Sequence, residues 1–86
     1  MAEYAIVFAR SARKQLQVLD RTHALRILGR IESLALAPRP AGCVKLEGGG
    51  GHWRIRVGDY RVIYEIDDDR RRIDVSAVRH RRDAYR

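Results

Sequence analysis

The chain has 86 residues, enough for one domain over residues 1–86 and too few for a deep pocket around a large cofactor. Its formal charge of +7 predicts an anionic partner, either a nucleic acid or an acidic protein. The single cysteine, Cys43, excludes an internal disulfide and argues against a cysteine-based zinc site. No apolar run approaches the ~20 residues of a membrane helix, and no signal peptide is recognisable, so we expect a cytoplasmic protein without membrane association.

The N-terminal half predicts one strand followed by two helices. Residues 4–8 form a short apolar run rich in β-formers, which is typical of a strand. Ser11 is expected to cap a first helix of about two turns. Asp20 or Thr22 is expected to cap a second helix, whose apolar stripe repeats at helical spacing until Pro38 ends it.

From Cys43 onward the apolar spacing changes from helical to alternating, which predicts strands. A short strand at 43–46 and a glycine-rich loop at 48–51 come first. Three further strands are expected at 52–57, 60–67 and 72–78. The predicted fold is therefore α+β: an N-terminal strand, a two-helix hairpin on one face of a small antiparallel sheet, and then a β-meander.

The central hairpin sorts its residues cleanly between two faces. Gly58 in the first central position predicts a two-residue type II′ turn, which places Arg56 opposite Arg61 and Arg54 opposite Ile63. One face is then wholly apolar or aromatic, and the helices should cover it: Trp53, Ile55, Val57, Tyr60, Val62, Tyr64 and Ile66. The other face collects arginines that repel one another, which favours phosphate binding over a merely solvated charged surface.

The last strand should bring further basic residues to the arginine face. Alternation from Ile73 and Val75 on the apolar face places His80 on the arginine face, if the strand extends that far. Arg81 reaches the same face only if the chain leaves the strand after Val78 or His80. A frayed basic terminus is the alternative interpretation of this tail.

The acidic run at 67–69 precedes three arginines in a turn, where solvated charges compensate one another. This arrangement gives little support to a metal site. The glycines at 48–51 lack the pattern of a nucleotide-binding loop. We therefore expect no metal and no cofactor.

The chain resembles the RelE/ParE toxin superfamily. Leu46 with Gly48, the segment at 53–66 and the HRRDAY sequence at 80–85 carry the resemblance, which covers essentially the whole chain. The HRxxxY ending is similar to that of the RelE branch. The resemblance implies a bacterial type II toxin that cleaves mRNA in the ribosomal A site. It also implies a RelB-like antitoxin that holds the toxin inactive in a hetero-oligomer.

The family motifs imply roles for particular residues. Arg61, Arg81 and Tyr85 match the catalytic positions, and His80 matches a histidine that some relatives use in this stretch. Arginine is a poor base because its pKa exceeds 12, so the arginines are expected to clamp the phosphate and stabilise its added charge. Either Tyr85 or His80 would then take the proton from the attacking 2′-hydroxyl, and the sequence does not decide between them.

The basic residues before the turn are expected to bind substrate. Arg54 and Arg56 match family positions that contact mRNA, and Lys45 completes the predicted phosphate-binding set. Two other function classes remain open on the same fold. A ParE-like toxin would inhibit DNA gyrase without nuclease activity, and an inactive module would only bind RNA.

Overall fold

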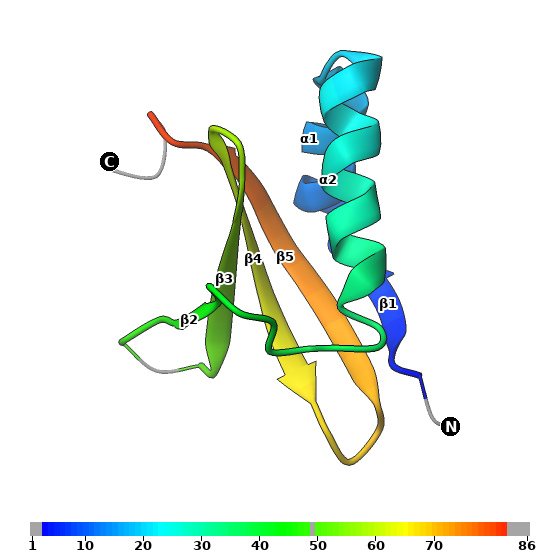
Figure 1. Cartoon of the computed structure of the whole chain (residues 1–86), viewed down its shortest axis with the longest axis vertical. Coiled ribbons are helices and arrows are strands. Elements are labelled where there is room, and N and C mark those ends of the chain that lie inside the picture. Colours follow the sequence, from blue (N-terminus) through cyan, green and yellow to red (C-terminus); the bar gives the residue numbers. More distant parts are fainter. Residues whose placement is uncertain (1–2, 49, 83–86) are drawn as a thin grey trace.

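The computed structural model describes residues 3–48 and 50–82. Five strands and two helices follow one another in the predicted order (Figure 1). Their bounds are β1 Ala5–Phe8, α1 Arg10–Val18, α2 Arg21–Ser33, β2 Val44–Lys45, β3 His52–Val57, β4 Tyr60–Asp67 and β5 Arg72–His80. Neither helix in the described part of the chain is long or apolar enough to cross a bilayer.

The two helices begin in different ways. The carboxylate of Asp20 accepts a hydrogen bond of 2.8 Å from the backbone N–H of His23, so Asp20 caps α2 as predicted. The prediction that Ser11 caps α1 is wrong, because the N-cap is Ala9, two residues earlier, and Ser11 lies within the helix. The Ser11 hydroxyl instead donates to the carbonyl of Ser76 in β5, at 3.2 Å.

The strands form one mixed sheet in the order β1-β5-β4-β3-β2. Strands β2 to β5 pair in antiparallel fashion, as the predicted meander requires. The edge strand β1 instead runs parallel to β5, so the sheet is mixed rather than purely antiparallel. Because β1 and β5 are joined through the whole intervening chain, no short turn restricts their relative direction.

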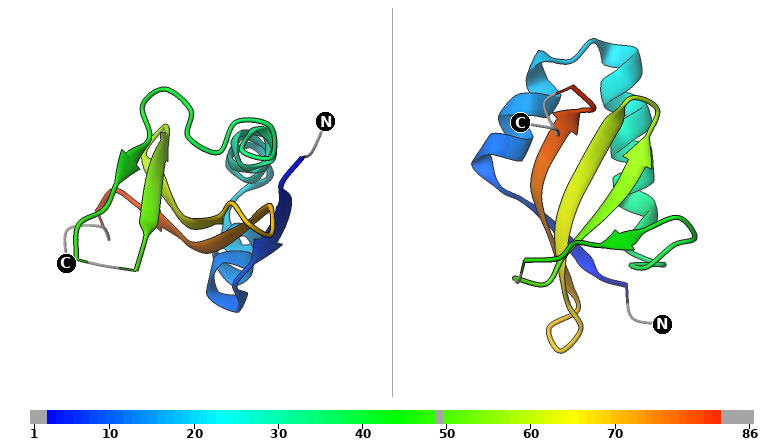
Figure 2. Two further views of the ribbon diagram at one scale, coloured as in Figure 1. Left: turned by 90° about the horizontal axis from the view of Figure 1, so that it is seen from below. Right: turned by 90° about the vertical axis from the view of Figure 1, so that its left-hand side faces the viewer.

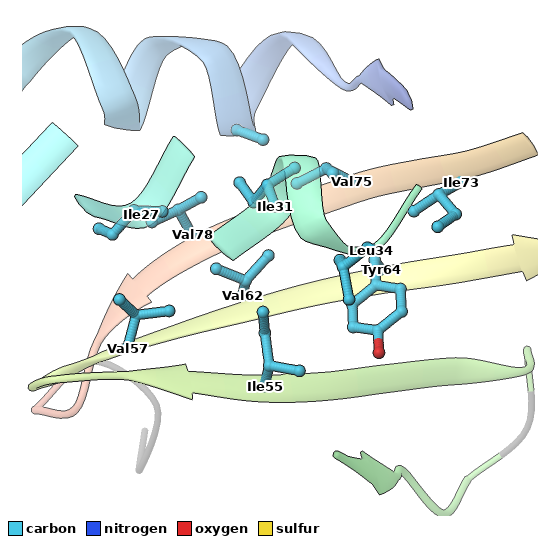
Figure 3. Close-up of a cluster of buried hydrophobic side chains, with 11 residues drawn as sticks. Ile27, Ile31, Leu34, Ile55, Val57, Val62, Tyr64, Ile73, Val75 and Val78 are labelled. Atoms are coloured by element: carbon cyan, nitrogen blue, oxygen red, sulfur yellow. The ribbon is translucent and has the colours of Figure 1, made fainter. Parts of the chain in front are cut away.

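Both helices lie on the same side of the sheet. In Figure 2 (right) the sheet faces the viewer and the helices lie behind it. The core between the two layers is apolar (Figure 3) and contains Ala12, Ile27, Ile31, Leu34, Ile55, Val57, Val62, Tyr64, Ile73, Val75 and Val78. Full burial of one such aliphatic side chain contributes about 1.5–3 kcal/mol. The predicted apolar face of the β3–β4 hairpin is thus the covered face, and the opposite face, called here the outer face, is left without a helix among the described residues.

Candidate nucleic-acid interface

The turn between β3 and β4 sets the positions of the first arginines. Gly58 has a φ of 60°, whereas Asp59 has a negative φ, as a type II′ turn requires. The register follows from this turn: Arg56 is opposite Arg61, and Arg54 is opposite Ile63. Residues directly opposite share a face, so Arg54, Arg56 and Arg61 all lie on the outer face, as predicted.

A bulge in β5 changes the predicted placement of the last strand. Pairing with β4 shifts between Ile63 and Tyr64, where Ile63 is opposite Ala77 but Tyr64 is opposite Val75, which leaves Ser76 as the extra residue. Beyond the bulge every side chain of β5 changes face. Val78 therefore points into the core, where it is 2% exposed.

The bulge also overturns the expected position of His80. This residue is opposite Tyr60, so it lies on the helix-covered face and not among the arginines. Its ring contacts the Tyr60 ring edge-on, with 5.2 Å between the centroids. Sequence alternation alone gave the wrong face, because one extra residue in a strand inverts the pattern that follows it.

The same bulge adds Arg79 to the outer face, where it is opposite Arg61. The sequence analysis missed Arg79, since strict alternation assigns it to the covered face. Arg81 follows after the strand ends, and its backbone N–H donates to the carbonyl of Asp59 at 2.7 Å. Four arginines from three segments thus meet at the turn end of the sheet: Arg56, Arg61, Arg79 and Arg81.

A hollow of about 170 Å³ opens among these side chains. Its described lining, called here the arginine hollow, consists of Arg56, Gly58, Asp59, Arg61 and Arg81. Asp59 is the one carboxylate in that lining, and its Oδ1 lies 3.9 Å from Nη1 of Arg81. Both side chains of this pair are about two-thirds exposed, so their attraction is weak, and the described lining holds three arginines against one carboxylate.

The hollow continues around the end of the sheet to His80. A second, more open depression is lined by Asp59, His80, Arg81 and Arg82. Nδ1 of His80 accepts a hydrogen bond from the backbone N–H of Arg82 at 3.2 Å. In the neutral ring the proton therefore sits on Nε2. His80 is close to Arg81 through this depression, although it belongs to the other face.

Two predicted phosphate ligands lie away from the hollow. Arg54 is two pairs further along β3 than Arg56, half-buried between Val44 of β2 and Ile63 of β4. Lys45 is opposite Trp53, so it lies on the covered face, with its Nζ 6.0 Å from the centroid of the Trp53 ring. The structure thus does not bring Lys45 together with the arginines. Tyr85 lies outside the described residues.

Two of the described tyrosines have environments unsuited to a base. Burial raises the pKa of Tyr64, whose hydroxyl donates to the carbonyl of Pro38 at 2.8 Å. A hydrogen bond to the carboxylate of Asp68 raises the pKa of the half-buried Tyr4. Both shifts favour the neutral phenol. Neither side chain lines the arginine hollow.

The opposite end of the outer face is rich in carboxylates instead of arginines. A depression there is lined by Glu65, Ile66, Asp67, Asp68, Asp69, Arg72 and Asp74, called here the acidic end. Arg72 Nε lies 3.3 Å from Asp74, and Arg39 Nη2 lies 2.9 Å from Asp68. Hydrogen bonds from Arg39 and Tyr4 hold the pKa of Asp68 below its ordinary value. Across residues 3–48 and 50–82, no three His, Cys, Asp or Glu side chains form a group able to hold a metal ion.

The fold and the cationic sheet define a class: the small α+β toxins of the RelE/ParE superfamily. A chain of the archaeal RelE–RelB complex from Pyrococcus horikoshii is 32% identical, with a TM-score of 0.81 over 92% of this chain and 96% of that chain. A chain of the RelBE2 toxin–antitoxin complex from Mycobacterium tuberculosis is 25% identical, with a TM-score of 0.81 over 91% and 98%. A chain of the RelB–RelE complex from Methanococcus jannaschii is 29% identical, with a TM-score of 0.72 over 92% and 94%.

The family model for the ParE toxin of the type II toxin–antitoxin system parDE matches residues 6–85. No curated protein sequence matches the chain. The chain belongs to the ParE toxin family within the RelE/ParE superfamily, and it is a toxin of a type II toxin–antitoxin system. The complex from Pyrococcus horikoshii is archaeal, so the fold is not confined to bacteria.

Proposed function

We propose that this toxin is a ribosome-dependent endoribonuclease that cleaves mRNA in the A site without a metal ion. The observation that carries the proposal is the arginine hollow, where Arg56, Arg61 and Arg81 converge from three segments with one exposed carboxylate among them. Guanidinium groups match the geometry of phosphate oxygens and keep their charge at every physiological pH. Its lining of three arginines, one aspartate and one glycine suits a phosphodiester better than an apolar ligand.

The reaction begins with attack of a 2′-hydroxyl on the adjacent phosphorus. The O–P bond forms as the 2′-proton leaves to a base, and the bond to the 5′-oxygen of the next nucleotide breaks. The products are a 2′,3′-cyclic phosphate and a 5′-hydroxyl, which takes up a proton. Charge accumulates on the phosphate oxygens as the new bond forms, and we assign its stabilisation to Arg61 and Arg81. Arg54 and Arg56 are assigned to substrate phosphate binding.

The base is assigned to Tyr85, which resembles the family's terminal tyrosine. In this proposal, an arginine guanidinium beside the phenol would favour its phenolate. His80 is the alternative, but its Nδ1 already accepts the Arg82 N–H, which leaves Nε2 protonated in the neutral ring. We therefore assign His80 a hydrogen-bonding role beside the substrate. Lys45 is retained only as a contact to more distant RNA, because Trp53 holds it on the other face.

A single modified message tests this chemistry. An mRNA with a 2′-deoxynucleotide at the cut site lacks the attacking hydroxyl. We expect primer extension to show cleavage of the unmodified message and none at the modified position. Equal cleavage of both messages would exclude the mechanism, because water or another nucleophile would then be attacking.

The second candidate is a gyrase inhibitor that has no nuclease activity. The observation that favours it is the family match, since the matching model describes the ParE toxin of parDE. Translation in a cell-free system with primer extension, run beside a gyrase supercoiling assay, separates the two functions. Cuts within codons support the nuclease, and inhibition of supercoiling without cuts supports the ParE-like action.

We also propose that a RelB-like antitoxin binds and inhibits this chain in a cytoplasmic hetero-oligomer. The solved relatives from Pyrococcus horikoshii, Mycobacterium tuberculosis and Methanococcus jannaschii are themselves toxin–antitoxin complexes. A +7 toxin suits an acidic partner segment. Binding should raise the melting temperature of the toxin, since a ligand of the folded state stabilises it by mass action.

A further inference from the structure

The inference concerns the outer edge of β5 beyond the point where β1 ends. The parallel pairing of β1 with β5 stops at Phe8 and Val75, and the backbone N–H of Ala9 donates to the Val75 carbonyl at 2.9 Å. The chain then turns away into α1. The next residues of β5 therefore lose their strand neighbour on this side at the point where the bulge begins, and their backbone groups need other partners.

Two side chains of α1 supply those partners. The hydroxyl of Ser11 donates to the carbonyl of Ser76 at 3.2 Å, and Oε1 of Gln15 accepts the backbone N–H of Val78 at 2.8 Å. Ser11 and Gln15 are four residues apart, so they lie one above the other on the same face of the helix. Between them, Ala12 is fully buried and brings α1 close to the sheet.

The bulge decides which arginines reach the outer face. With it, Arg79 is opposite Arg61, and Arg81 lines the arginine hollow. Without it, the alternation from Val75 would turn Arg79 and Arg81 toward the helices and Val78 toward solvent. The two hydrogen bonds from α1 flank Ala77, directly after the extra residue, and so act on the segment whose register is in question.

We infer that Gln15, assisted by Ser11, is a positioning residue for the phosphate-binding arginines. Its amide oxygen holds the Val78 N–H, fixes the bulge in β5 and thereby keeps Arg81 in the arginine hollow. The effect on cleavage rests on the proposed nuclease function, whereas the effect on strand register does not. The competing explanation is that burial of Val78 alone maintains the register.

Hydrogen exchange at the Val78 amide tests whether Gln15 holds this N–H and fixes the bulge in β5. Gln15→Met keeps the length of the side chain and removes the acceptor, while Gln15→Glu keeps an acceptor oxygen. Gln17→Met, at an exposed position of the same helix, is the matched control. We expect Val78 protection to fall about fivefold to tenfold in Gln15→Met, as loss of one hydrogen bond of roughly 1 kcal/mol or slightly more implies. Gln15→Glu and Gln17→Met should retain it.

A double-mutant cycle with Arg81→Ala tests whether Gln15 affects cleavage by positioning Arg81. If Gln15 acts through Arg81, cleavage should fall in Gln15→Met, and adding Arg81→Ala should cost much less than it does in the wild-type protein. Rates that simply multiply, or Val78 protection unchanged in Gln15→Met, would overturn the inference. If the wild-type protein cleaves no RNA, the proposed function fails, while Val78 exchange and the β4–β5 cross-strand NOEs still decide whether Gln15 sets the register.

Discussion

The two ends of the outer face contain the same kind of side chain in opposite settings. At the acidic end, Nε of Arg72 lies 3.3 Å from Asp74, so the two charges compensate each other within the protein. Asp68 of the same end is paired at 2.9 Å with Arg39, which also lies over the Trp53 ring of the covered face. At the turn end, the described lining of the arginine hollow holds Arg56, Arg61 and Arg81 with one exposed carboxylate, Asp59, whose Oδ1 lies 3.9 Å from Nη1 of Arg81. Similar local composition thus produces a structural ion pair at one end and, at the other, the cluster of arginines that we propose binds the RNA phosphate. The difference lies in where the carboxylates fall along the strands.

The register explains this division. Asp67 is opposite Arg72, and Asp74 lies two residues from Arg72 along the same strand, so both carboxylates lie beside this arginine. Arginines opposite one another at the turn end cost sheet stability, of the order of a few tenths of a kcal/mol to 1 kcal/mol for each like-charge pair. A bound phosphate would relieve that repulsion. The following predictions contrast the two ends.

The largest effect is expected for the arginines of the hollow. Arg61→Ala and Arg81→Ala should each lower the cleavage rate by about 10²–10³, the usual cost of losing one donor to developing charge. Arg72→Ala, at the acidic end, is the matched control and should cleave normally. Primer extension on a translated message measures all three, with circular dichroism to check folding. Retained cutting by Arg61→Ala would refute its assignment to the phosphate.

A smaller effect is expected for Arg79, which the bulge brings beside the hollow. Arg79→Ala should weaken binding of single-stranded RNA about fivefold at 0.1 M salt and reduce the salt slope by about 0.7, the contribution of one phosphate contact. Arg70→Ala, in the β4–β5 turn near Asp67, removes the same charge from the other end. If both variants lost the same affinity, net charge rather than position would govern binding.

A still smaller change, in the opposite direction, is expected at Asp59. Asp59→Asn removes the carboxylate of the hollow and frees Arg81 from its weak pairing. RNA affinity should rise about twofold to threefold, since exposed ion pairs of this kind contribute at most about 1 kcal/mol. Fluorescence anisotropy with a labelled RNA measures the change. Weaker binding would mean that Asp59 orients Arg81 rather than competing with the phosphate.

The smallest effect on RNA binding is expected for Asp68→Asn, which should instead change the pH dependence of the toxin's thermal stability. Hydrogen bonds from Arg39 and Tyr4 lower its pKa in the folded state, so the stabilisation is present above the ordinary carboxyl pKa near 3.9 and disappears as the pH falls through the lower folded value. Thermal melts of wild type and Asp68→Asn should therefore converge below about pH 4. A difference that stayed constant into acid would contradict this origin.

Much of this arrangement follows from local sequence rules. The Gly58 turn, the register of β3 with β4 and the cap at Asp20 depend on neighbouring residues, so they could be predicted. The placement of His80 could not, because the bulge at Ser76 depends on long-range contacts with α1. Arg79 was missed for the same reason. One weak signal of the bulge is present in the sequence. Strict alternation would turn Arg79 and Arg81 toward the helices and the apolar Val78 toward solvent, which is unfavourable for all three.

Local sequence patterns also failed to predict the direction of β1 and the face on which Lys45 lies. The parallel direction of β1 depends on pairing between the two ends of the chain, about which neither strand's own pattern carries information. Lys45 occupies a two-residue strand, too short for alternation to assign a face, and Trp53 attracts it to the covered side. The role of Tyr85 stays a prediction, because it lies outside the described residues.

The most direct test of the arginine hollow is an NMR titration of the toxin with a short RNA made uncleavable by 2′-O-methyl groups. The Nε–H signals of Arg56, Arg61 and Arg81 should shift and saturate together, while those of Arg70 and Arg72 should not move. Shifts concentrated at the acidic end, or spread evenly over all arginines, would contradict the claim that the turn end of the sheet holds the RNA phosphate.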